Sequence, residues 1–224
     1  MNQTRWYESD GTNYDPNDQN NLFGSGWLPS HITHSGGIVT LQLDDAGCPN
    51  GCHNMQYASG EYQSTACYSY GIYEASIKAA NKEGVVTTFF TYTEPYGTPG
   101  NHEIDIEIKG KQETCANNQP KTVMQANYYV EQHEHLIDLC FDASAAFHTY
   151  AFEWRPWMIQ WSVGGQMVHT VYRSEGVPLP RLPGKIMVSL WGANSNQAAI
   201  NWLGTFSYTG TPVKAEYDWI KYTP

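Results

Sequence analysis

Short runs of alternating apolar and polar residues recur along most of this chain, and they constrain its fold more than any other feature. The runs are rich in Val, Ile, Thr, Tyr and Phe, which favour strands, and turn-forming residues separate them. The predicted strands cover 36–44, 57–65, 70–80, 84–94, 102–110, 122–130, 135–142, 147–156, 158–173, 184–192 and 213–223, with Gly164-Gly165 as a hairpin turn within 158–173. No segment shows a strong helical period, although 142–147 has the length of one helical turn.

Length and composition agree with an all-β protein. A chain of 224 residues is normal for a sandwich or barrel, and 14% aromatic residues, 15% charged residues, 20 Gly and 12 Pro fit many strands joined by turns. We therefore predict one domain over residues 1–224, built as a sandwich of two large antiparallel sheets. Residues 1–35 show no period and are predicted to be a loop-rich lead-in packed on the sandwich.

The net charge and the cysteine content limit which binding partners and which cellular compartment we expect. A net charge of -10 argues against nucleic acid or an anionic membrane as a partner and suits a neutral substrate. No apolar run is long enough to span a membrane, and no signal peptide is visible after Met1. We favour an exported protein, secreted or periplasmic, and we expect a monomer with one or two disulfides and at least one free thiol.

The five cysteines are Cys48, Cys52, Cys67, Cys115 and Cys140. Cys48 and Cys52 bracket a turn, so they predict either a small disulfide loop or half of a metal site. Cys67 follows a strand-like run and is predicted to be a buried, small apolar residue.

The segment "EIDIEI" at 103–108 places three carboxylates at every second position of one predicted strand. Side chains at these spacings share one face of a strand, and the isoleucines between them take the other face. Because the isoleucines should be buried in the core, Glu103, Asp105 and Glu107 should point to a polar face that is open to a ligand. Three close acids cannot all ionise easily, so at least one pKa should be raised, as a general acid requires near neutral pH.

Two carboxylates on either side of a glycosidic bond are the basic machinery of glycoside hydrolysis. Flanking predicted strands supply the rings and amides that sugars stack on and bond to, namely Phe90, Tyr92, Gln125, Asn127, Tyr129 and Trp191. Two other interpretations of the acids are a calcium site, which usually prefers loops, and an acidic edge strand that prevents aggregation.

Several motifs resemble those of a known family. "EIDIE" resembles the catalytic signature of glycoside hydrolase family 16. "GVVTTFFTYTEP", "QANYY", "FDASAAFHTYAFEWRP", "PGKIMVSLW", "WLGTF" and "AEYDWIKYT" resemble the bacterial lichenases (β-1,3-1,4-glucanases) of that family, in order and at similar spacing over roughly 57–223. The resemblance implies a concanavalin A-like β-jelly-roll with a concave cleft and a retaining mechanism on β-glucans, without a cofactor for catalysis.

The resemblance also implies roles for individual residues. Glu103 would be the nucleophile, Glu107 the general acid/base and Asp105 the assisting acid between them. The implied substrate-binding residues are Glu61, Phe90, Tyr92, Gln125, Asn127, Tyr129, Trp191 and Trp202. Gln63 and His102, which depart from the family pattern, are added as further candidates. Asp218 would be a ligand of a structural calcium ion on the convex face, with Gly37 near it. His102 would bond the substrate, tune Glu103, or be an exposed residue without a role.

The sequence departs from the lichenase pattern at a few positions. Gln63 stands where Arg is usual, Asn101-His102 replace Trp-Asp before the nucleophile, and serines at 25 and 59 replace the usual cysteine pair. An insertion carries Cys115, which could reach Cys140 on the neighbouring strand.

The expected function is therefore endo-acting, retaining hydrolysis of β-1,3-1,4-glucan (lichenan, cereal β-glucan). One alternative is a transglycosylase, or a hydrolase of another β-linked polysaccharide such as laminarin, xyloglucan or an agar-type polymer. A further alternative is a lectin-like module, although a pure binding protein has no need of the three acids.

Overall fold

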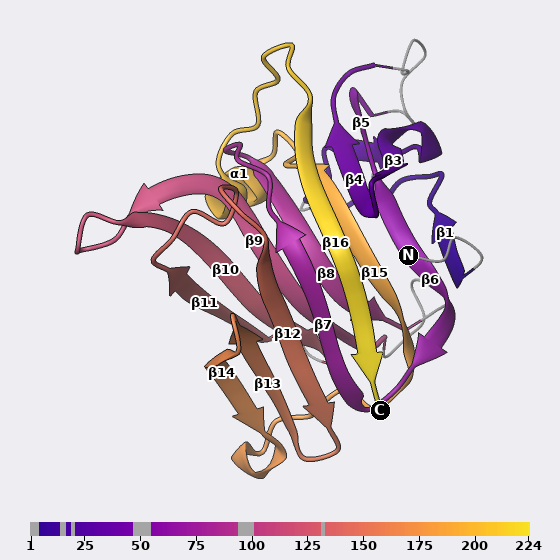
Figure 1. The fold of residues 1–224 in the computed structure, drawn as a ribbon, viewed down its shortest axis with the longest axis vertical. Coiled ribbons are helices and arrows are strands. Elements are labelled where there is room, and N and C mark those ends of the chain that lie inside the picture. The colour runs from indigo at the N-terminus through magenta and orange to yellow at the C-terminus, as the bar shows by residue number, and fades with distance from the viewer. Residues whose placement is uncertain (1–4, 14–16, 19–20, 47–54, 94–100, 131–132) are drawn as a thin grey trace.

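Two seven-stranded antiparallel sheets pack face to face in the computed structural model, which describes residues 5–13, 17–18, 21–46, 55–93, 101–130 and 133–224 (Figure 1). We call the sheet that carries the acidic strand the cleft sheet. Its strands, in spatial order, are β1 (Trp6–Glu8), β6 (Glu61–Tyr68), β15 (Gly184–Gly192), β8 (Val85–Tyr92), β9 (Glu103–Thr114), β10 (Pro120–Tyr129) and β11 (His133–Leu139).

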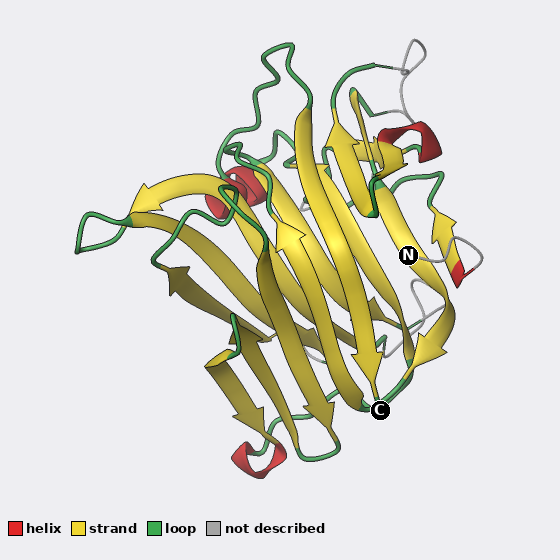
Figure 2. Cartoon of the chain, in the orientation of Figure 1, coloured by secondary structure: helices red, strands yellow, loops and turns green. Residues whose placement is uncertain are grey.

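The second sheet, which we call the back sheet, covers the other side of the core. Its spatial order is β14 (Gln166–Tyr172), β13 (Met158–Val163), β12 (His148–Arg155), β7 (Gly71–Lys78), β16 (Val213–Thr223), β4 (Ile38–Leu43) and β3 (Ile32–Ser35). Among the described residues there is also a short parallel pair, β2 (Ser25–Trp27) and β5 (Tyr57–Ser59). Helical segments there include η2 (Pro29–His31), η3 (Arg173–Glu175) and α1 (Gln197–Leu203) (Figure 2). The prediction of an all-β sandwich is confirmed.

Each predicted strand has a counterpart at nearly the same residues; 184–192 and 213–223, for example, are β15 and β16. The predicted hairpin turn is also present, because Gly164 and Gly165 both have positive φ, +58° and +77°, between β13 and β14. The segment 142–147 is a turn rather than a helix. The Asp142 carboxylate accepts a hydrogen bond from the backbone N–H of Ser144 at 2.9 Å, an arrangement that favours a turn.

The lead-in is more ordered than we predicted. It contributes β1, β2 and β3, and β1 extends the cleft sheet by pairing with β6. Strands of three or four residues are too short to show an alternating pattern, so the sequence offered no signal for them.

The core lies between the two sheets and fixes the cleft strands from behind. The isoleucines at 104, 106 and 108 are completely buried, as predicted. Two side chains of the back sheet reach across the core: Trp161 Nε1 donates to the Asp105 carbonyl at 3.0 Å, and the Tyr217 hydroxyl donates to the Thr88 carbonyl at 2.8 Å. These bonds hold β9 and β8 in place directly beneath the acids.

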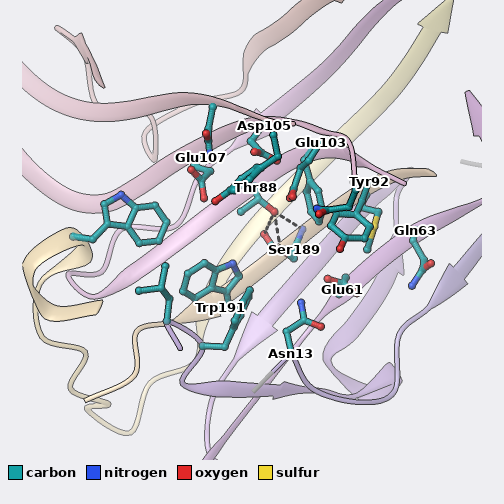
Figure 3. Close-up of a pocket in the computed structure, with 18 residues that line it drawn as sticks. Asn13, Glu61, Gln63, Thr88, Tyr92, Glu103, Asp105, Glu107, Ser189 and Trp191 are labelled. Atoms are coloured by element: carbon teal, nitrogen blue, oxygen red, sulfur yellow. Dashed lines mark hydrogen bonds between the residues drawn. The ribbon is translucent and has the colours of Figure 1, made fainter. Parts of the chain in front are cut away.

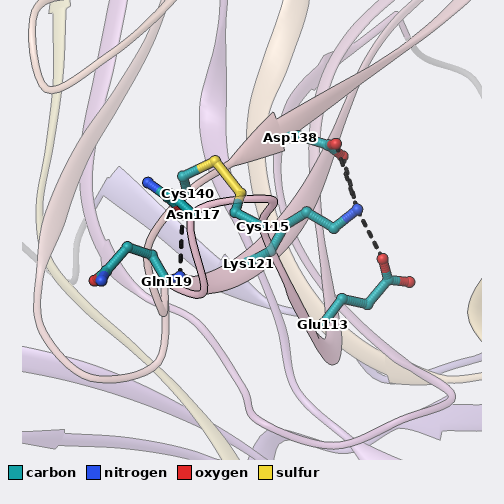
Figure 4. The surroundings of a disulfide bond; sticks show 7 residues. All are labelled: Glu113, Cys115, Asn117, Gln119, Lys121, Asp138 and Cys140. Carbon is teal, nitrogen blue, oxygen red and sulfur yellow. Dashed lines mark hydrogen bonds and ion pairs between the residues drawn. A yellow bond between two sulfur atoms is a disulfide. The ribbon is translucent and has the colours of Figure 1, made fainter.

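A disulfide joins Cys115, in the turn between β9 and β10, to Cys140 just after β11, and the two Cα atoms are 5.8 Å apart (Figure 4). The expectation that these two cysteines could meet is confirmed. Beside the disulfide, Lys121 forms ion pairs with Glu113 at 2.8 Å and Asp138 at 3.3 Å. Together these contacts connect the far ends of three adjacent strands.

The other cysteine predictions have different outcomes. Cys67 is an exposed free thiol, so its predicted burial is wrong; the end of β6 extends to where the core no longer covers it. Cys48 and Cys52 lie outside the described residues. Within the described part of the chain, no helix is long and apolar enough to cross a membrane.

Candidate active site

The acidic strand β9 lies in the interior of the cleft sheet, with β8 on one side and β10 on the other. Its pairing with β8 runs without a register shift from Tyr92↔Glu103 to Val86↔Lys109. The three acids therefore occupy a regular strand without a bulge, and their side chains share one face. An interior position also excludes the interpretation of β9 as an acidic edge strand.

The three acids project into a cleft of about 510 Å³ on the outer face of the cleft sheet (Figure 3). Eight of the predicted substrate-binding residues line it: Glu61, Gln63, Phe90, Tyr92, Asn127, Tyr129, Trp191 and Trp202. Residues that we did not predict also line it: Asn13, Leu22, Phe23, Thr88, Asn101, Met187 and Ser189. The first three belong to the lead-in. Asn101 was noted only as a departure from the lichenase pattern, and no binding role was predicted for Thr88, Met187 or Ser189.

Cross-strand registers align the cleft residues in rows that run perpendicular to the strands. One row crosses the whole sheet in the order Tyr7, Gln63, Met187, Phe90, Asp105, Asn127 and Glu134. The adjacent row contains Glu61, Ser189, Thr88, Glu107, Gln125 and Leu136. Because neighbouring strands are about 4.8 Å apart, the residues of a row can contact successive parts of an extended ligand that lies across the sheet.

Burial and mutual repulsion change the proton affinities of the acids. Burial raises the pKa of Glu103 to about 7; a hydrogen bond with Asp105 lowers it and the Glu61 charge raises it. The pKa of Asp105 lies well above its usual range because of burial, the charges of Glu103 and Glu107, and the hydrogen bond to Glu103. We infer that Asp105 stays protonated and donates a hydrogen bond to Glu103. Glu103 therefore ionises before Asp105 does.

The proton affinity of Glu107 is raised as well. Burial raises its pKa to about 8, and the charges of Glu103 and Glu134 add to this effect, whereas Gln125 and Lys109 lower it. Gln125 Nε2 donates to Glu107 Oε2 at 2.9 Å, and Gln125 Oε1 accepts from Trp202 Nε1 at 2.8 Å. The site thus holds carboxyl groups whose pKa values are raised towards neutral pH, as acid/base catalysis requires.

The model of glycosyl hydrolases family 16 matches residues 9–221 of this chain. The chain belongs to this family. Beta-glucanase from Paenibacillus polymyxa is 41% identical, and the alignment covers 100% of this chain and 84% of that protein.

Two solved structures with the same fold agree with this assignment. A prokaryotic beta-1,3-1,4-glucanase (lichenase) derived from a mouse hindgut metagenome has a TM-score of 0.83 and 36% identity, covering 100% of this chain and 95% of that one. Bacillus licheniformis beta-glucanase has a TM-score of 0.80 and 36% identity, covering 100% and 94%.

Two predicted substrate-binding residues of this family 16 member do not line the cleft. His102 is buried on the side opposite to Glu103, because successive side chains of a strand alternate. Its Nδ1 accepts the backbone N–H groups of Arg181 at 2.7 Å and Leu182 at 3.2 Å. Burial and the Arg181 charge lower the pKa of His102, so the ring is neutral and holds a loop rather than a sugar. Gln125 acts through Glu107 and Trp202, as described above.

The two residues implied for calcium lie on neighbouring segments of the back sheet, in β16 and in the β3–β4 turn. Asp218 is exposed on β16 at a register shift between Tyr217 and Trp219. Gly37 lies in the β3–β4 turn with a φ of +87°, and the pairing Tyr217↔Val39 brings this turn next to Asp218. Among the described residues, no cluster of three or more His, Cys, Asp or Glu side chains could hold a metal ion. Calcium here would therefore need backbone carbonyl oxygens beside the Asp218 carboxylate.

Proposed function

We propose that this chain is an endo-acting, retaining glycoside hydrolase that cleaves β-1,3-1,4-glucan. The observation that carries the proposal is the regular triple-acid strand, with raised proton affinities, at the floor of an aromatic-lined cleft. The cleft crosses several strands, which suits a polymer that binds along its length. The preference for mixed-linkage glucan is supported by the lichenase identity of the relatives and by the absence of a bulge at the acids.

In the first proposed step, Glu103 attacks the anomeric carbon while Glu107 gives its proton to the departing glycosidic oxygen. The bond from this carbon to the leaving oxygen breaks, and a bond to a Glu103 oxygen forms. In the second step, Glu107 takes a proton from water, the water oxygen bonds to the same carbon, and the Glu103 carboxylate leaves. Two inversions retain the configuration, and Asp105 donates its hydrogen bond to Glu103 throughout.

The cleft walls supply sugar binding in this proposal. Phe90, Tyr92, Trp191 and Trp202 offer rings for stacking, and Tyr129 adds a ring beside the acids. Glu61, Gln63 and Asn127 offer carboxylate and amide groups to sugar hydroxyls. The tryptophans at 191 and 202 contact each other, with ring centroids 5.7 Å apart, so they form one aromatic wall.

Export and calcium binding are part of the same proposal. A disulfide between Cys115 and Cys140 persists only in an oxidising environment, which supports a secreted or periplasmic location. A structural calcium ion, if bound, would be held by the Asp218 carboxylate and the Gly37 carbonyl, far from the acids, and would add stability rather than chemistry.

The proposal is tested by the release of reducing sugar from barley β-glucan, lichenan, laminarin, xyloglucan, carboxymethylcellulose and agarose. We expect release from the first two, with the anomeric configuration retained in a product analysis by NMR. Glu103→Gln and Glu107→Gln should each lower kcat on these polymers by at least 10³-fold, whereas Glu74→Gln, on the back sheet, should have no effect. Full turnover by Glu103→Gln would refute the mechanism. Release from another polymer would refute the linkage, and binding without release would favour the lectin-like alternative.

A further inference from the structure

Four polar side chains form a continuous hydrogen-bonded series along the cleft wall made by β1, β6 and β15. Lys185 Nζ donates to Gln63 Oε1 at 2.9 Å. Gln63 Nε2 donates to Ser9 Oγ at 2.8 Å, and Ser9 Oγ donates to Glu61 Oε1 at 2.7 Å. We call this series the Lys185–Glu61 relay. Glu61 and Gln63, which line the cleft, are labelled in Figure 3.

The chemistry of its members gives the relay one direction. An ammonium group can only donate, so the oxygen of the Gln63 amide must face Lys185 and its nitrogen must face Ser9. Ser9 Oγ then accepts from Gln63, and its single hydrogen is directed to Glu61. A hydroxyl that donates to a carboxylate makes a short, charge-assisted bond, in keeping with the 2.7 Å distance.

Burial makes this arrangement costly to disturb. Ser9 is 5% exposed, Glu61 4% and Gln63 8%. A buried polar group that loses its partner costs far more than an exposed one, because water cannot replace the lost bond. The relay therefore fixes the Glu61 carboxylate in one orientation before a ligand arrives.

The position of Glu61 indicates what the fixed carboxylate can do. Glu61 lies in the same cross-strand row as Glu107, separated from it by β15 and β8. Three strand spacings of about 4.8 Å place the backbones of these two residues ~14 Å apart. A sugar unit that contacts Glu61 therefore lies on the β6 side of the cleft, away from Glu107.

We propose that Lys185 and Ser9 are specificity-determining residues, which act by orienting Glu61 and Gln63 as a rigid recognition pair for the hydroxyls of a sugar unit remote from the cleaved bond. Gln63 stands where the lichenase pattern usually has Arg. The ammonium group of Lys185, which bonds to the Gln63 amide, places a positive charge beside this position. This inference rests on the proposed function for the identity of the ligand. It assigns a role to Ser9, which no motif marks, and to Lys185, which lies in the motif "PGKIMVSLW" but had no predicted role.

The sharpest test is Gln63→Glu. This change keeps the size of the side chain and replaces the amide donor that faces Ser9 with an acceptor. A carboxylate at 63 accepts from both Lys185 and Ser9, so the Ser9 hydrogen turns away from Glu61. Affinity is measured by calorimetry in a Glu103→Gln background, with a long mixed-linkage oligosaccharide that reaches Glu61 and a short one that does not. We expect about tenfold weaker binding of the long ligand and unchanged binding of the short one.

Further variants separate the relay from a general structural effect. Ser9→Ala should also weaken binding of the long ligand, and the two losses should combine less than multiplicatively in the double variant, because both changes disturb the Ser9–Glu61 bond. Lys185→Met should also weaken it, and Lys185→Arg should restore most of the loss. Thr65→Val, on the same strand, is the matched control and should leave both ligands unaffected.

Several results would overturn the relay. They are unchanged affinity in Gln63→Glu or Ser9→Ala, losses that multiply in the double variant, or equal losses for the short and long ligands. Because binding is measured without turnover, a failure of the intact protein to hydrolyse glucan would refute the proposed function without deciding the relay test.

Discussion

Replacing Glu107 with Gln should stabilise the folded protein, and the gain should grow with pH. The pKa of Glu107 is 4.5 in an unperturbed chain and about 8 in the folded protein, chiefly through burial and the charges of Glu103 and Glu134. Between these values the folded state binds more protons than the unfolded state, so the stability of the natural protein falls as pH rises. Below pH 4.5 Glu107 is protonated in both states, and this penalty is absent.

The magnitude follows from the same two values. For an isolated group they correspond to ~5 kcal/mol lost above pH 8. We expect Glu107→Gln to recover about half of this stability, ~2 kcal/mol. The full value does not apply because the cleft admits water beside Glu107 and because the two neighbouring acids share the cost of ionisation. For a chain of this length that corresponds to a rise in Tm of about 4–8 °C. Gln retains an oxygen that can accept the Gln125 hydrogen bond, so packing should be kept.

The assay is thermal unfolding, monitored by circular dichroism, of the natural protein and of Glu107→Gln at a series of pH values from 4.5 to 8.5. The difference in Tm should be near zero at the acid end and maximal at the alkaline end. Glu74→Gln, which removes a carboxylate from the back sheet, should show no comparable trend. A difference that does not depend on pH, or a less stable Glu107→Gln at pH 8.5, would refute the reasoning.

Three further predictions concern activity, the disulfide and calcium. Hydrolysis needs ionised Glu103 and protonated Glu107, so kcat/KM should rise through about pH 7 and fall through about pH 8; an optimum below pH 5 would contradict this assignment. Replacing Cys115 and Cys140 with Ser opens a loop with a sequence separation of 25 residues, which should cost about 3 kcal/mol in denaturant unfolding, with kcat unchanged. Adding calcium to the chelated protein should raise Tm, and Asp218→Asn should abolish the rise; an equal rise in both would argue against this site.

The sequence was most informative where a pattern was both long and chemically specific. Alternation along β9 placed the isoleucines in the core and the acids in the cleft, and the structure agrees at each position. Strands of six or more residues were predicted for the same reason. The helix α1 was missed because it has only seven residues and begins with a single cap, the Asn196 side chain, which accepts from the Ala199 N–H at 2.9 Å.

The rest of the site depends on contacts between residues that are distant in the sequence. Ser9 meets Glu61 across 52 positions, and Lys185 meets Gln63 across 122, so neither pair leaves a local signal. For His102 the error was a contact that was expected but is not made, since it was predicted to bind the substrate. It stands next to Glu103 in the sequence, but strand alternation directs it into the loop at Arg181. Proximity along the chain was a poor guide to proximity in the cleft.

The strand order of the cleft sheet divides the site into two halves with different architectures. On one side of the acids, β10 and β11 follow β9 directly, and the disulfide ties these three strands together. On the other side, β8 directly precedes β9 in the chain, whereas β15, β6 and β1 come from distant parts of it. Residues 103–140 therefore form a cassette that could be exchanged between relatives as one piece. The opposite half is assembled from separate segments, so we expect new specificities to arise more readily by recombination on the β10–β11 side and by point substitution on the other.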